Sequence, residues 1–224
     1  MDDTCVIIPV YNESQSIKNV ISSLHFFKNI ICIDDGSIDD CDKIIQDTPA
    51  KLIQHTINLG QGAAIQTGIE FALQDPNLCY FVTFDADGQH QVVDIINMIK
   101  AIRKRDLDVI IGSRFLGSTV GMPYYKKALL KIGILFTNSM NGSNLTDVHN
   151  GLRVFNRKVA ESINIENSDY SHASEITEKI FKNNYKYVEM PVTITYTKYS
   201  KTKGQPMSNA VNIAFDELLK KFNR

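Results

Sequence analysis

Short apolar runs alternate with amphipathic stretches through the first half of the chain. The apolar runs are rich in β-branched residues and predict buried strands over Thr4–Val10, Asn29–Ile33, Lys51–His55, Cys79–Phe84 and Asp108–Gly112. Apolar residues at helical spacing predict helices between them, over Glu13–Leu24, Asp39–Gln46, Gln61–Leu73 and Val92–Arg105. Strands that alternate with helices of this length predict an α/β fold whose mainly parallel sheet is covered on both faces.

The second half of the chain has a less regular pattern. It predicts a helix, a strand, a second helix, an extended segment and a last helix, over Tyr124–Met140, Gly151–Phe155, Ala173–Asn183, Tyr187–Thr197 and Ala210–Phe222. No repeat, low-complexity tract or Gly/Pro-rich linker interrupts the 224 residues. We therefore expect one domain over residues 1–224, with a first half of residues 1–115 and a second half of residues 116–224.

Charge divides at the same boundary. Residues 1–115 carry a net charge of −7 and residues 116–224 a net charge of +6, which leaves −1 for the whole chain. A 43% hydrophobic content with so little net charge excludes a mainly disordered chain. The same balance is atypical of a nucleic-acid-binding protein, so no nucleic-acid partner is expected.

The sequence predicts neither a membrane-spanning helix nor a secretory leader. No stretch reaches the roughly 18–20 apolar residues that a transmembrane helix needs. The start, Met1-Asp2-Asp3, is acidic where a signal peptide would be basic. We expect a cytoplasmic protein.

Four cysteines, Cys5, Cys32, Cys41 and Cys79, show no metal-binding spacing. All but Cys41 fall in predicted buried strands. Reduced core thiols are therefore favoured over a structural zinc site.

Polar, acidic and glycine-rich segments follow all five predicted strands of the first half. In chain order they are P-V-Y-N-E (9–13), D-D-G-S (34–37), N-L-G-Q-G (58–62), D-A-D-G-Q-H (85–90) and G-S-R (112–114). One such segment is typical of an ordinary turn. Five at one edge of a parallel sheet indicate a ligand site, because open α/β sheets bind ligands beyond the carboxyl ends of their strands.

The acidic segment after the fourth strand suggests a metal. Asp85 and Asp87 are separated by one residue and can both point at a hard divalent cation, Mg²⁺ or Mn²⁺, while Gln89 can add a neutral oxygen. A D-x-D pattern alone is common in loops, so this prediction depends on the other segments.

The sequence fits two common nucleotide-binding classes, dinucleotide-binding and P-loop proteins, poorly. Gly60 and Gly62 open a helix as in a dinucleotide-binding turn, but Ile65 stands at the third glycine position and the turn follows the third strand. No G-K-[ST] of a phosphate-binding P-loop is present. The small residues Gly60, Gly62, Ala63 and Ala64 predict that a nucleoside approaches the backbone closely.

Taken in order, I-P-V-Y-N-E, D-D-G-S, N-L-G-Q-G-A-A, D-A-D-G-Q-H and G-S-R-F resemble the motifs of family 2 inverting glycosyltransferases, which have the Rossmann-like GT-A fold. The similarity covers about residues 4–205 and extends to the dolichol-phosphate mannose synthase-like and bacterial polyprenyl-phosphate branch. It implies a metal-dependent enzyme that moves a sugar from a UDP- or GDP-linked donor to a polyprenyl phosphate or saccharide acceptor.

The resemblance also implies roles for individual residues. The nucleoside pocket would be lined by Pro9, Tyr11, Glu13, Ile33, Asp35 and Ala64. Asp35 would accept a hydrogen bond from the base, and Ala86 would lie with Asp85 and Asp87 at the ribose and diphosphate. The metal would be held by Asp85, Asp87 and Gln89. Arg114 would contact phosphate, for which its fork of donors is suited.

Two later segments match the family less completely. Thr146–Arg153 resembles T-D-x-x-S-G-F-R, and its Asp147 and Arg153 are implied for the acceptor or sugar side. The following R-x-x-G-x-S-K motif is altered, and only Lys203 matches, as a further phosphate contact. This departure weakens the case for a dolichol-phosphate mannose synthase in particular.

The acceptor decides whether the reaction needs a base. A polyprenyl phosphate is already anionic, whereas a sugar hydroxyl must lose its proton to a carboxylate, for which Asp147 is the candidate. A structural cap or an ion pair with Arg153 is the alternative role for Asp147.

The segment from Tyr124 to Phe136 mixes tyrosines and lysines with apolar residues. Such a helix can lie on an anionic bilayer, and peripheral contact with the inner face of the membrane is one interpretation. An ordinary core helix explains the pattern equally well.

Two other functions stay open. A sugar-phosphate nucleotidyltransferase would have a glycine-rich signature and a basic residue after the first strand, where Tyr11-Asn12-Glu13 stands instead. A catalytically silent nucleotide-sugar-binding subunit would not need the intact Asp85, Asp87 and Gln89.

Overall fold

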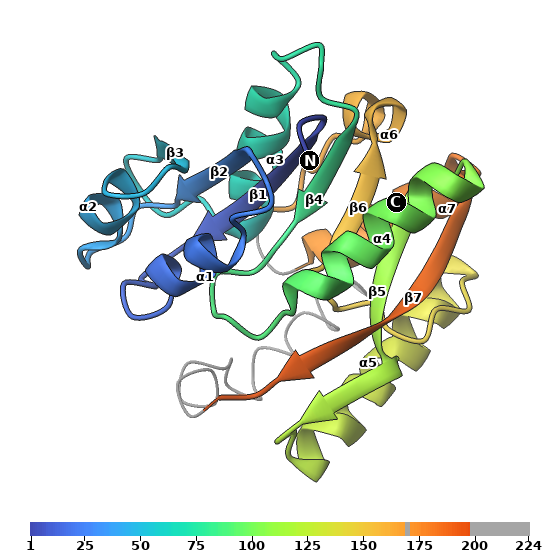
Figure 1. The fold of residues 1–224 in the computed structure, drawn as a ribbon. Coiled ribbons are helices and arrows are strands. Elements are labelled where there is room, and N and C mark those ends of the chain that lie inside the picture. The colour runs from blue at the N-terminus through green and yellow to red at the C-terminus, as the bar shows by residue number, and fades with distance from the viewer. Residues whose placement is uncertain (169–170, 198–224) are drawn as a thin grey trace.

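A computed structural model describes residues 1–168 and 171–197 of the chain. Lys203 and the predicted helix Ala210–Phe222 lie outside the described residues. One seven-stranded sheet runs through the molecule in the order β3-β2-β1-β4-β6-β5-β7 (Figure 1). Its strands are β1 (Thr4–Val10), β2 (Asn29–Asp34), β3 (Lys51–Gln54), β4 (Tyr80–Thr83), β5 (Val109–Val120), β6 (Arg153–Asn156) and β7 (Tyr187–Thr195).

The sheet is parallel except at β6, which is antiparallel to both of its neighbours, β4 and β5. The predicted α/β fold with a mainly parallel sheet is confirmed. β5 crosses the boundary between residues 115 and 116, so strands from both halves share one hydrogen-bonded sheet.

Helices cover both faces of the sheet (Figure 1). They are α1 (Ile17–Ser23), α2 (Cys41–Gln46), α3 (Gln61–Ala72), α4 (Val92–Arg105), α5 (Tyr124–Asn141), α6 (Arg157–Ser162) and α7 (His172–Lys182). Alternation along β1 builds both cores, because Val6 and Ile8 face the cluster with α1, α2 and α4, while Ile7 faces the cluster with α3, α6 and α7.

β5 is longer than predicted and is interrupted. The apolar run ends at Gly112, but pairing with β7 continues to Val120 after a register shift between Ser113 and Ser118. Ser113 pairs with Pro191, which has no N–H to donate, so the ladder is broken at this point. The partner strand lies more than 70 residues further along the chain, and local sequence carries no sign of the pairing.

The first helix is shorter than predicted. It begins at Ile17 rather than Glu13, because the amide groups of Ser16 and Ile17 both donate to the Glu13 carbonyl and form a turn. Residues 13–16 thereby stay in the loop that follows β1.

The cysteines are all free thiols. Cys5 and Cys32 are buried as predicted, and burial raises the pKa of each thiol to about 12. Cys79 is exposed, contrary to prediction, because β4 begins one residue later, at Tyr80.

No helix within residues 1–168 and 171–197 combines the length and the apolar character required to cross a bilayer.

α3 lies close against the sheet because Gly68 has no side chain. A Cβ at this position would lie 2.4 Å from Cγ2 of Ile7 and 2.7 Å from Cδ1 of Ile33. Both isoleucines are fully buried. The approach places the start of α3 beside the ends of β1 and β2.

We predict that Gly68→Val destabilises the fold by about 1–3 kcal/mol, because the added methyl groups overpack the contact with Ile7 and Ile33. Urea unfolding measures the change. Glu70→Val, on the exposed side of the same helix, serves as the control and should stay within about 0.5 kcal/mol of wild type. Equal stabilities for the two variants would contradict the packing.

Candidate active site

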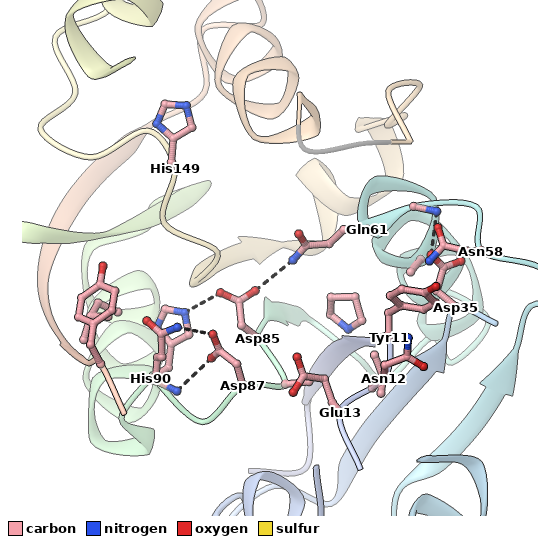
Figure 2. Close-up of a pocket in the computed structure, with 18 of the residues that line it drawn as sticks. Tyr11, Asn12, Glu13, Asp35, Asn58, Gln61, Asp85, Asp87, His90 and His149 are labelled. Atoms are coloured by element: carbon pink, nitrogen blue, oxygen red, sulfur yellow. Dashed lines mark hydrogen bonds and ion pairs between the residues drawn. The ribbon is translucent and has the colours of Figure 1, made fainter. Parts of the chain in front are cut away.

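A cleft of about 770 Å³ opens at the carboxyl ends of β1, β2 and β4. Its walls contain ten of the residues predicted for the site: Pro9, Tyr11, Glu13, Asp35, Ala64, Asp85, Ala86, Asp87, Gln89 and Arg114. Figure 2 shows Asp35 with Tyr11 and Asn12 at one end, and Asp85 and Asp87 beside His90 at the other. The strand-end segments therefore converge on one cavity, as expected for an open α/β sheet.

Ile33 does not belong to the cleft. Its side chain is fully buried and packs in the core beneath α3. The pocket position that the resemblance implies for Ile33 is therefore not seen, because its place in β2 turns the side chain toward α3.

The loops after β1 and β2 are fastened to each other. The Asn12 amide donates to Oγ of Ser37 at 2.9 Å, and the Ile38 amide donates to Oδ1 of Asn12 at 2.8 Å. Asn12 adopts a left-handed conformation with φ 56°, which asparagine tolerates better than most residues. Beneath them, Sγ of Cys41 accepts from the Glu13 amide at 3.0 Å.

Asp35 points at the cleft from the end of β2 and is almost fully buried. Its Oδ1 accepts from the Leu59 amide at 2.9 Å, and its Oδ2 accepts from the Gly60 amide at 2.7 Å. Both donors belong to the loop that leads into α3. The carboxylate therefore fixes this loop and presents acceptor oxygens at the cleft.

Asp85 is held on two sides. Its Oδ2 lies 2.9 Å from Nε2 of His90, and its Oδ1 accepts from Nε2 of Gln61 at 3.2 Å (Figure 2). Burial opposes ionisation, but the hydrogen bond and charge of His90, with the charges of His172 and Arg153, hold the pKa of Asp85 below its ordinary value. The surrounding positive groups thus favour the ionised form of Asp85.

Asp87 experiences the opposite balance. Burial, and then the charge of Asp85, raise the pKa of Asp87 to about 6. Its Oδ1 accepts from the Gln89 amide at 3.1 Å, and its Oδ2 accepts from the Gln89 side chain. Two carboxylates thus share a cleft in which negative charge is only partly compensated.

The donor set fits a hard divalent cation. Asp85, Asp87 and Gln89 offer carboxylate and amide oxygens within one cleft, and a cation would offset the repulsion that raises the pKa of Asp87. In the described part of the chain no three His, Cys, Asp or Glu side chains group as metal ligands. Two protein carboxylates are typical of Mg²⁺ sites that phosphate and water complete.

The opposite wall is cationic. Arg114 lines the cleft, and its Nε and its backbone amide donate to Oδ2 of Asp147 at 2.6 and 3.0 Å. Its Nη1 donates to the Tyr196 hydroxyl at 3.1 Å. Burial opposes the charge, but Asp147 raises the pKa of Arg114. The guanidinium is therefore charged and held in a fixed orientation.

Asp147 lies behind the cleft and is fully buried. Its ion-pair partner is Arg114 rather than Arg153. Arg153 is also buried, and its Nη2 donates to the Val148 carbonyl at 2.9 Å. Neither Asp147 nor Arg153 is part of the cleft lining, and Asp147 reaches the cleft only through Arg114.

Sequence reasoning missed several lining residues, namely Lys126, His149, Ile194 and Tyr196. Lys126 lies in the first turn of α5, with Nζ 4.8 Å from the ring centroid of Tyr196. Burial, and then the charge of Arg114, lower the pKa of Lys126. The tyrosines and lysines around residue 126 predict only that this segment is exposed. Nothing in the local sequence predicts the contact between Lys126 and Tyr196.

Gly62 serves packing rather than a nucleoside. A Cβ there would lie 2.0 Å from the carbonyl oxygen of Asn167, and the Gly62 amide donates to the Ser168 carbonyl at 2.8 Å. The close approach predicted at this glycine is made by the protein's own backbone.

The glycosyl transferase family 2 model matches residues 5–163. The chain belongs to glycosyl transferase family 2. It is 31% identical to the UDP-N-acetylglucosamine–dolichyl-phosphate N-acetylglucosaminyltransferase of Methanococcus voltae, over 98% of this chain and 96% of that one. It is 28% identical to the polyprenol monophosphomannose synthase of Mycolicibacterium smegmatis, over 93% and 84% of the two chains.

Solved structures agree on the fold. Glucosyl-3-phosphoglycerate synthase of Mycobacterium tuberculosis, crystallised with Mn²⁺, UDP and glucosyl-3-phosphoglycerate, has a TM-score of 0.72 at 13% identity. The similarity covers 95% of this chain and 76% of the synthase. The GT-A fold, the glycosyltransferase class and the polyprenyl-phosphate branch predicted from the motifs are confirmed.

We predict that Gly151→Ala weakens Mn²⁺ binding about tenfold or more, because a Cβ at this position would lie 2.4 Å from Oδ2 of Asp85 and displace the carboxylate. Calorimetric titration with Mn²⁺ measures the change. Gly142→Ala is the control, since it is strained by φ +64° but has no neighbour within 4 Å, and its Mn²⁺ affinity should not change. Unaltered Mn²⁺ affinity in Gly151→Ala would refute the role of this glycine.

Proposed function

We propose that the protein is a metal-dependent inverting glycosyltransferase that moves a sugar from a nucleoside-diphosphate sugar to a polyprenyl phosphate. One observation carries this proposal: a single cleft holds a base-facing carboxylate, Asp35, a carboxylate pair, Asp85 and Asp87, and two cations, Arg114 and Lys126. This order matches a ligand with a nucleoside, a diphosphate and a second anionic group.

Each wall has a separate task. Tyr11, Asp35 and Ala64 bind the nucleoside, and Asp85, Asp87 and Gln89 would hold Mg²⁺ or Mn²⁺. When bound, the metal would neutralise the diphosphate and stabilise negative charge on the leaving nucleotide. Relatives of the same fold that bind Mn²⁺ with UDP support this assignment.

Arg114 supports the same step from the opposite wall. Asp147 and Tyr196 fix its guanidinium before the substrate arrives, so little reorganisation is required when charge develops. The acceptor then attacks the anomeric carbon from the face opposite the leaving group, which inverts its configuration.

The surroundings of Asp147 favour a phosphate acceptor over a sugar hydroxyl. A hydroxyl acceptor needs a base, and Asp147, the residue predicted for this role, is fully buried and bonded to Arg114. A polyprenyl phosphate is already anionic and is attracted by Arg114 and Lys126. The named substrates of the two relatives support this class of acceptor.

The helix α5 offers a surface for peripheral contact with an anionic bilayer at the cytoplasmic face. Its exposed side combines apolar and aromatic residues with two lysines, namely Tyr124, Tyr125, Lys127, Lys131, Ile132 and Leu135. Lys126 instead lines the cleft, so one helix would contact both the lipid surface and the site. Ile134 and Thr137 are buried, which shows that α5 also contributes to the core.

We predict that UDP- or GDP-sugars with Mn²⁺ or Mg²⁺ raise the melting temperature, and that Asp87→Ala loses the metal-dependent part of this shift. Turnover in Asp87→Ala should fall at least about 100-fold, because the metal and leaving group lose a ligand. Asp106→Ala, a fully exposed acidic position, is the control: its left-handed backbone (φ 48°) lowers the baseline melting temperature of the variant, but the metal-dependent shift and the turnover should match wild type.

The same panel separates the alternatives. No stabilisation by UDP-, GDP- or dTDP-sugars would overturn the proposed donor class. Binding without turnover on polyprenyl phosphate or saccharide acceptors would indicate a silent binding subunit. Pyrophosphate release from a sugar phosphate and a nucleoside triphosphate would indicate nucleotidyl transfer.

We predict that the protein floats with vesicles containing phosphatidylglycerol, and that Ile132→Glu/Leu135→Glu reduces the bound fraction several-fold by placing carboxylates against the anionic surface. Phe26→Glu/Val93→Glu, at exposed apolar positions outside α5, is the matched control. Equal flotation of the two double variants would rule out α5 as the contact surface, and absence of wild-type flotation would rule out the contact itself.

A further inference from the structure

Besides the Leu59 and Gly60 amides, the Asp35 carboxylate has a third hydrogen-bond partner, His55, which lies outside the sequence motifs. Nδ1 of His55 lies 2.7 Å from Oδ1 of Asp35, and Nε2 of the same ring lies 3.0 Å from Oγ1 of Thr67. The His55 side chain is 9% exposed and that of Asp35 is 3% exposed. The three side chains come from the end of β2, the loop after β3 and the middle of α3, so the chain of contacts joins separate elements behind the cleft.

The hydrogen bonds can be assigned a consistent direction. Two backbone amides already donate to the Asp35 carboxylate, which identifies it as an acceptor. His55 therefore donates from Nδ1, and in the neutral ring Nε2 is left as an acceptor for the Thr67 hydroxyl. Thr67 thus fixes the orientation of the His55 ring, and His55 fixes the orientation of the Asp35 carboxylate.

We propose that His55 is a positioning residue for recognition of the nucleobase, acting through Asp35 and oriented by Thr67. The inference rests on the proposed function, because Asp35 must be the residue that contacts the base. His55 does not line the cleft, so its effect on a ligand is indirect.

The arrangement predicts which bases are accepted. His55 and the Leu59 amide occupy Oδ1, while Oδ2 has the Gly60 amide and one further acceptor direction. An acceptor oxygen selects a base with a ring N–H at its pairing edge, as in uracil, thymine and guanine. Cytosine and adenine present a ring nitrogen acceptor there, and two acceptors repel each other.

The test compares UDP and GDP with CDP and with pyrophosphate, each titrated calorimetrically with Mn²⁺ into the full chain. His55→Phe retains a ring but loses both hydrogen bonds, and should bind UDP or GDP about tenfold more weakly while its pyrophosphate affinity is unchanged. In His55→Phe the ratio of UDP or GDP affinity to CDP affinity should fall by a similar factor.

Two further variants separate positioning from folding. His55→Asn keeps a donor near the Nδ1 position and should retain affinity within about threefold of wild type. Thr67→Val removes the hydroxyl but keeps the shape of the side chain, and its loss of UDP or GDP affinity should lie between those of His55→Asn and His55→Phe. If His55→Phe fails to fold, these two variants still test the proposal through the same ligands.

The outcomes distinguish the inference from the function on which it rests. Wild-type affinity for UDP and GDP in His55→Phe and Thr67→Val would overturn the positioning role alone. Equal weakening of UDP and pyrophosphate would show a structural role and also overturn it. A wild-type protein that binds no nucleoside diphosphate would overturn the proposed function together with the inference.

Discussion

The charge of Asp85, a partly buried carboxylate in the cleft, is the constraint around which the site is arranged. Removing a charge from water costs several kcal/mol unless other groups compensate it. Here His90 and Gln61 bond its oxygens, and the buried Arg153 contributes positive charge from behind. These partners come from three separate parts of the chain, so they surround the carboxylate only in the completed fold.

The antiparallel strand β6 brings the last of these partners into place. The parallel strands β1 and β4 end at the cleft, whereas β6, inserted between β4 and β5 in the opposite direction, begins there. Its first residue, Arg153, and the preceding Gly151 therefore lie beside Asp85. The reversed strand explains how a segment some 65 residues distant in sequence becomes part of the same site.

The acidic wall of the cleft could be predicted from sequence more completely than the basic wall. The residues after β1, β2 and β4 follow continuous apolar runs, and the geometry of parallel sheets determines where such residues meet. The family resemblance implies a pocket position for Ile33, but the alternation of side chains along β2 directs it into the core with α3. Lys126 and Tyr196 could not be placed, because their meeting depends on pairing between β5 and β7.

The interrupted hydrogen-bond ladder between β5 and β7 determines where Arg114 lies. Between Ser113 and Ser118 the strand advances five residues while β7 advances only two, from Pro191 to Thr193. The surplus chain includes Arg114 and leaves it outside the regular hydrogen-bonding pattern. The same stretch holds Phe115, which packs against the core that contains α3, so the position of Arg114 is coupled to that packing. The register shift therefore lets one strand supply both a regular core segment and an irregular, charge-bearing wall of the cleft.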